Sequence, residues 1–89
     1  MNSIITVLGH DKVGIIAGVC NYLAESNINI LDISQTILQG YFNMIMIVDM
    51  KGANKGFDAV ADDLEKLGDK IGVSIRIQNE DIFNSMHRI

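Results

Sequence analysis

The chain has 89 residues, of which 48% are hydrophobic, and a formal net charge of −4. This length fits one small domain, and a domain of this size buries only about 60–65% of its unfolded surface. Part of the apolar surface is therefore predicted to be buried against another subunit. The 7 basic residues form no run and are outnumbered by 11 acidic ones. That balance counts against nucleic acids and anionic membranes as partners, because both attract clustered Lys and Arg.

Cysteine usage and hydropathy predict a cytoplasmic protein. Cys20 is the single cysteine, which excludes an intrachain disulfide and fits a reducing compartment. The first residues carry neither a basic segment nor a long apolar segment, so no signal peptide is expected. No window reaches about 18 consecutive apolar residues, so no transmembrane helix is expected either.

The first third of the chain predicts a strand, a glycine-flanked turn and a helix. Residues 3–9 are short and rich in β-branched side chains, which is typical of a strand. Apolar residues then recur at helical spacing over residues 13–25. Asp11 is the predicted N-cap of this helix. Asn27 is predicted to end it in the left-handed conformation, with Ile28 supplying the apolar contact that follows.

Two strands joined by a tight turn follow. Residues 29–39 alternate apolar and polar side chains, and Ile30 lies out of phase, which predicts a bulge or the helix-to-strand junction there. Residues 39–40 form the turn. Residues 41–50 are apolar on both faces, which predicts a central strand covered on each side.

The last part predicts a helix, a strand and a tail helix. Residues 57–71 repeat apolar side chains at a spacing of three or four, and Gly72 is predicted to end this helix. Residues 73–78 alternate strictly and form a fourth strand. Residues 79–89 place apolar side chains on one helical face, with Asn79 as the predicted N-cap. A helix this short must dock on something to be stable.

The element order predicts an α+β fold of the ferredoxin-like type. The order is β-α-β-β-α-β, in which two right-handed crossovers interleave into an antiparallel four-stranded sheet with both helices on one face. The other face of the sheet is left open. A second copy or the tail helix is expected to cover part of it.

Three segments carry a resemblance to a known family. The turn Gly9-His10-Asp11-Lys12-Val13-Gly14-Ile15, followed by Asn29-Ile30-Leu31-Asp32-Ile33-Ser34-Gln35, looks like an ACT domain, a small regulatory module that binds amino acids. Residues 79–89 resemble the tail of free-standing bacterial ACT-domain proteins. The resemblance covers residues 1–89 as a single domain. It implies homodimers with sheets side by side or back to back, and ligand sites between the turn of one subunit and the second strand of its neighbour.

The resemblance and the chemistry of the turn together define a candidate ligand site. A glycine-flanked turn into a helix directs backbone N–H groups at an anion, which suits a carboxylate. Side chains of the second strand would receive an ammonium group. The alternative is an ordinary tight turn capped by Asp11, with Asn29 leaving the helix and Asp32 solvated. The candidate ligand-binding residues are Gly9, His10, Asp11, Lys12, Val13, Gly14, Asn29, Ile30, Leu31 and Asp32.

No catalytic, metal or cofactor site is predicted. His10 and His87 have no cysteine or carboxylate near them at metal-ligand spacing. Cys20 lies on the apolar stripe of the first helix and is interpreted as a buried structural thiol. Alternating methionines of the third strand, Met44 and Met46 among them, fit core or dimer packing better than a soft ligand pocket.

The predicted function is that of a non-catalytic, homodimeric sensor of a small molecule, an amino acid by resemblance, which regulates another protein. One alternative is a protein–protein interaction module that uses the open sheet face or the tail helix and has no ligand site. A remote alternative is an acylphosphatase-like hydrolase, although Arg76 and Arg88 lie too late in the chain to serve an anion loop. Tyr41 and Phe42 invite an RNA-binding interpretation, but the acidic balance counts against it.

Overall fold

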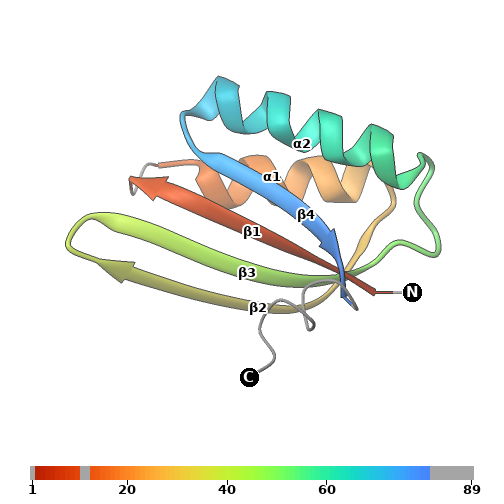
Figure 1. The fold of residues 1–89 in the computed structure, drawn as a ribbon, viewed down its shortest axis with the longest axis horizontal. Coiled ribbons are helices and arrows are strands. Elements are labelled where there is room, and N and C mark those ends of the chain that lie inside the picture. Colours follow the sequence, from red (N-terminus) through yellow and green to blue (C-terminus); the bar gives the residue numbers. More distant parts are fainter. Residues whose placement is uncertain (1, 11–12, 81–89) are drawn as a thin grey trace.

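The computed structural model describes residues 2–10 and 13–80. These residues form one antiparallel sheet in the strand order β2-β3-β1-β4, and both helices cover the same face of the sheet (Figure 1). The arrangement confirms the predicted ferredoxin-like sandwich. The predicted tail helix covers residues 79–89; Asn79, its predicted N-cap, is the last residue of β4, and residues 81–89 lie outside the described residues. The elements are β1 (Asn2–His10), α1 (Ile15–Glu25), β2 (Asn29–Leu38), β3 (Tyr41–Asp49), α2 (Phe57–Ile71) and β4 (Ser74–Asn79).

The hairpin between β2 and β3 has the geometry that its sequence predicts. Gln39 and Gly40 have φ angles of 52° and 82°, and positive φ at both positions matches the twist of the flanking strands in a two-residue turn. The register of β2 against β3 shifts between Ile30 and Asp32, so the predicted bulge is present. The extra residue is Leu31, which is exposed.

Helix α1 begins two residues later than the sequence predicts. Gly14 is its N-cap, with a φ of 91° that a glycine adopts without steric cost. The prediction that Asp11 is the N-cap is therefore wrong, because the left-handed glycine sets the point at which the helix starts. The side chain of Asp11 itself lies outside the described residues.

The end of α1 confirms the prediction for Asn27. Asn27 has a φ of 58°, its N–H donates to the Ala24 carbonyl at 3.1 Å, and the N–H of Ile28 donates to the Leu23 carbonyl at 2.9 Å. These two bonds form a Schellman motif, and Ile28 is buried as the apolar contact of that motif. Gly72 likewise ends α2 in the left-handed conformation, with a φ of 80°.

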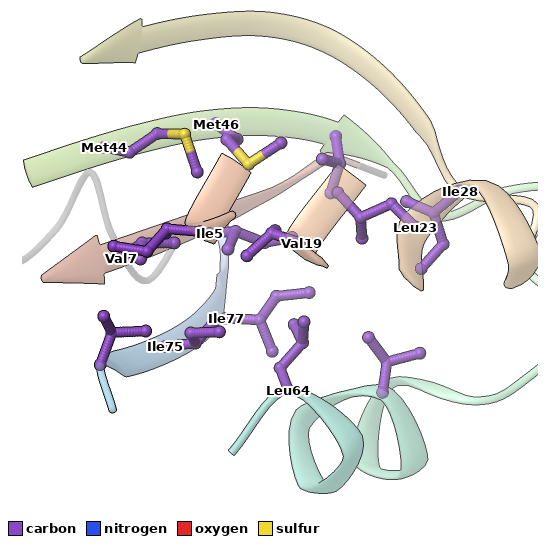
Figure 2. Packing of buried hydrophobic residues seen from close by; sticks show 14 of the residues in the cluster. Ile5, Val7, Val19, Leu23, Ile28, Met44, Met46, Leu64, Ile75 and Ile77 are labelled. Carbon is purple, nitrogen blue, oxygen red and sulfur yellow. The ribbon is translucent and has the colours of Figure 1, made fainter. Parts of the chain in front are cut away.

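The core lies between the sheet and the two helices, as Figure 2 shows. Met44 and Met46 are fully buried in it, which confirms the packing interpretation of the β3 methionines. Cys20 packs against this core but is only half-buried, so the expectation of a buried thiol holds in part. The largest fully buried side chains are Ile5, Val7, Val19, Leu23, Met44, Met46, Val48, Val60 and Leu64.

β3 is central, as predicted, but its two faces differ. On the helix side its apolar residues are buried, whereas Ile45 on the open face is exposed. Leu8 of β1 lies on the same open face and is exposed as well. The described residues therefore leave part of this face uncovered. Cover by a second copy or by the tail remains a prediction.

Candidate functional site

The first part of the candidate site is the amino-terminal end of α1, which lies in the helix layer. Gly14, its N-cap, has no side chain with which to cap the helix, and the first turn carries no acidic residue. Val13, just before it, is fully exposed. The first N–H groups of a helix point out of its end and carry a partial positive charge. This terminus therefore suits a carboxylate.

Two other residues of the predicted turn have structural roles. A Cβ atom added to Gly9 would lie 2.7 Å from Cγ1 of Val73, so Gly9 lets the residue just before β4 pack closely on β1. His10 stacks on Tyr41 with ring centroids 4.6 Å apart, at the end of β1 and on the open face of the sheet. His10 is thus on the opposite side of the sheet from α1. Asp11 and Lys12 lie outside the described residues.

The second part of the candidate site is the beginning of β2. Asn29 and Asp32 are exposed, Leu31 is exposed in the bulge, and Ile30 is half-buried. Oδ1 of Asp32 accepts the N–H of Ile33 at 2.9 Å, and a carboxylate has a second oxygen that can also accept. An exposed carboxylate and an exposed amide on one edge strand can receive an ammonium group.

The structure does not bring these two parts together within one chain. Gly9 lies opposite Phe42 on β3, whereas Asn29 lies opposite Asp49. Phe42 and Asp49 are seven residues apart along β3, which corresponds to roughly 24 Å in a strand. The turn and the start of β2 thus occupy opposite ends of the sheet. One ligand contacts both only if a second copy contributes one of them.

β2 is an edge strand with an apolar flank on its helix side. Ile33 and Ile37 lie opposite core residues of β3, yet they are 41% and 56% exposed. Ile16 of α1 is 39% exposed. Helical spacing places it on the flank of α1 that faces away from Tyr22, which contacts α2. We call Ile16, Ile33 and Ile37 the apolar flank.

A polar cluster that joins the two helices was not foreseen. The Tyr22 hydroxyl donates to Oδ2 of Asp63 at 2.7 Å, and Nζ of Lys55 donates to the same oxygen at 2.7 Å. The Lys55 bond, and then the Tyr22 bond, lower the pKa of the Asp63 carboxyl, and the bond to Asp63 raises the pKa of Lys55. Burial chiefly raises the pKa of Tyr22. Tyr22 and Asp63 are 41 positions apart, so no local pattern reveals the cluster.

The same end of the molecule fixes the loop that precedes α2. Nδ2 of Asn27 donates to the Gly52 carbonyl at 2.7 Å, and Nδ2 of Asn54 donates to the Glu25 carbonyl at 3.1 Å. These bonds hold the carboxy-terminal end of α1 against the loop. They are structural, and they lie far from the glycine-capped beginning of α1.

The described residues contain no group of three or more His, Cys, Asp or Glu that could hold a metal ion. In that part of the chain, neither helix has the length and the apolar character that a membrane span requires.

The site is thus a glycine-capped helix terminus and an exposed edge strand on a ferredoxin-like sandwich, and known proteins share this architecture. A family model described as "ACT domain" matches residues 3–78. A UPF0237 protein of Bifidobacterium longum is 63% identical over 87 residues, which covers 98% of this chain and 97% of that protein. An ACT domain protein from Streptococcus pneumoniae superposes with a TM-score of 0.82 at 43% identity, over 93% of each chain.

A larger enzyme contains a similar unit. A formyltetrahydrofolate deformylase from Pseudomonas syringae superposes with a TM-score of 0.76 at 25% identity, over 88% of this chain and 27% of the enzyme.

The chain belongs to the ACT-domain family. This family is a regulatory and non-catalytic type of domain. The remote acylphosphatase-like alternative is therefore wrong.

Proposed function

We propose that this chain is a cytoplasmic amino-acid sensor, one domain over residues 1–89, which acts as a homodimer and regulates another protein. The supporting observation is the separation of the two parts of the candidate site. Each is exposed, each suits one end of a zwitterion, and they lie at opposite ends of the same sheet. A second copy related by a two-fold axis brings the turn of one chain close to the start of β2 of the other.

Antiparallel pairing of β2 with β2 of a second copy gives the required geometry. A two-fold axis near the middle of the strand places the beginning of one β2 beside the end of the other. The end of β2 lies beside the start of β3, on the same side of the sheet as the turn after β1. The start of one β2 thereby approaches the end of the other sheet at which α1 begins, with the Asp32 side chain on the open face. The dimer has two equivalent sites, and its formation covers the apolar flank.

The chemistry of the proposed site follows from its two parts. The carboxylate of the amino acid accepts N–H groups at the start of α1, beside Gly14. Its ammonium group is received at the start of β2 of the other copy, where Asp32 and Asn29 lie, through charge-assisted bonds. The ligand therefore binds the dimer and not the separated copies. It shifts the population toward the dimer by this difference in affinity, and a regulated partner can sense that shift.

A thermal-shift screen with each of the twenty amino acids tests the proposal. One or a few are expected to raise the melting temperature, since a ligand at about 100 times its Kd stabilises by about 2.7 kcal/mol. Asp32→Ala should abolish the response and leave the protein folded. Asp62→Ala removes an exposed carboxylate of α2 instead and should preserve it.

The competing function is an interaction module without a ligand site. If no amino acid changes the melting temperature at millimolar concentration while the dimer stays intact, the sensor proposal is wrong and the interaction module remains. A response that Asp32→Ala leaves unchanged would also contradict the proposed site.

A further inference from the structure

A groove of about 610 Å³ runs beside β4, at the edge of the sheet away from β2. Its apolar lining comes from Leu8, Val73 and Ile75, and its charged lining from Glu65, Asp69 and Arg76. A cavity of this size is within the range that accommodates ligands larger than one amino acid. The groove shares no residue with the proposed amino-acid site.

The groove lies along the outer edge of β4. Among the described residues, β4 pairs with β1 and is the last strand in the sheet order. In an antiparallel edge strand, alternate residues direct their N–H and C=O groups outward, where an added strand can pair with them. An extended peptide can therefore bind by β-augmentation, with backbone bonds to β4 and side chains in the groove.

The charges beside this edge select the occupant. Asp58, Asp62, Glu65 and Asp69 follow one another at a spacing of three or four, so they share one flank of α2. The ion pair that α2 makes within the described residues, Lys55 with Asp63, lies on the other flank, toward α1. The carboxylates beside the groove thus have no cation of this chain paired with them in the described part. A strand carrying Lys or Arg complements them.

We propose that the β4 edge accepts an extended, Lys- or Arg-containing segment of a partner protein as a fifth strand. A second copy is a poor occupant, because two-fold pairing of β4 edges would bring two rows of carboxylates together. The partner segment instead places cations beside Glu65 and Asp69 and an apolar side chain over Leu8, which is exposed in the groove lining. This surface goes beyond the proposed ligand site, and it gives the dimer a contact with the protein it regulates.

A peptide titration tests the proposal. A short capped peptide of alternating Lys and Val is added to the ¹⁵N-labelled full chain, without any amino acid present, and binding is monitored by NMR. Saturable amide shifts are expected over residues 65–76 at up to about 1 mM peptide. The same peptide with N-methyl groups along one backbone edge should lose binding, because it cannot pair with a strand. Free lysine at equal concentration should give no such shifts.

A charge exchange adds specificity to the test. E65K/D69K should weaken the Lys peptide about tenfold, since two exposed ion pairs are replaced by repulsion. The same variant should bind a Glu–Val peptide instead. D58K/D62K changes the net charge equally on the same flank but outside the groove lining, and should bind the Lys peptide within about threefold of the original affinity.

Four results would overturn the docking edge: no saturable shift over residues 65–76, equal loss in both double variants, unchanged binding of the N-methylated peptide, or the same shifts from free lysine. None of them bears on the amino-acid site at α1 and β2, so the two proposals fail separately.

Discussion

The two edges of the sheet differ in length and in chemistry. β2 spans ten residues and carries the exposed side chains of Ile33 and Ile37 on its helix side, whereas β4 spans six residues beside a flank of carboxylates. An apolar edge suits a permanent contact with an identical copy. A charged edge resists self-pairing and suits a different partner. Under the two proposals, each edge of the sheet has its own partner and its own kind of side chain.

The largest expected effect comes from charging the apolar flank. I33K/I37K places two ammonium groups where two copies would pack, and the double variant should raise the dimer dissociation constant at least about 100-fold. Both positions are exposed in the single chain, so the fold should survive. Sedimentation at a series of protein concentrations measures the change, and circular dichroism checks the fold.

A matched variant on the open face decides between the two dimer arrangements. L8K/I45K introduces the same charge at exposed apolar positions on the other side of the sheet. If this pair dissociates the dimer while I33K/I37K does not, the copies pack back to back and the β2 arrangement is wrong.

A smaller effect is expected at the β4 edge, where α2 approaches the strand closely. A Cβ atom at Gly68 would lie 2.6 Å from the backbone carbonyl oxygen of Val73, and a backbone atom cannot move aside as a side chain can. Gly68→Ala should destabilise the fold by about 2 kcal/mol. This corresponds to a loss of about 10 °C in melting temperature, measurable by calorimetry.

Substitution of Gly18 in α1 is expected to change the stability in the opposite direction. A Cβ atom there would meet only Cδ1 of Ile71, at an ordinary 3.9 Å. Gly18→Ala should therefore gain up to about 1 kcal/mol from helix propensity alone. Equal losses from both substitutions would show that close packing of α2 on β4 is not what Gly68 provides.

The sequence predicted the elements well, because each one follows a local pattern. Helix α2 has the predicted bounds, and Asn27 ends α1 as expected, since periodicity and left-handed residues are local signals. The start of α1 was misplaced because two features competed for the same role. Asp11 has the better capping side chain, but Gly14 has the backbone freedom that the turn uses.

The candidate site was harder to predict, because it depends on where the ends of strands meet. The sequence identified the turn and the start of β2 but could not show that they lie at opposite ends of the sheet. It placed His10 with the turn, whereas strand alternation directs His10 to the open face. The acidic flank of α2 was visible in the sequence as spaced carboxylates. Its relation to the β4 edge became apparent only from the strand order.

The smallest expected effect is a difference between the two flanks of α2 in how they change the stability of the fold as the pH falls. The bonds from Lys55 and Tyr22 hold the pKa of the Asp63 carboxyl below its usual range, so the unfolded chain binds this proton more readily than the folded one. The contribution of Asp63 is therefore complete above the unfolded pKa of about 4 and is lost as the pH falls through the lower folded value. Urea unfolding at several pH values should show the stability of the original chain converging on that of Asp63→Asn as the solution is acidified.

Glu65→Gln removes a carboxylate on the β4 flank that has no ion pair among the described residues, and should show no such convergence. Convergence in both variants would mean that the acid response belongs to α2 as a whole and not to the flank that faces α1.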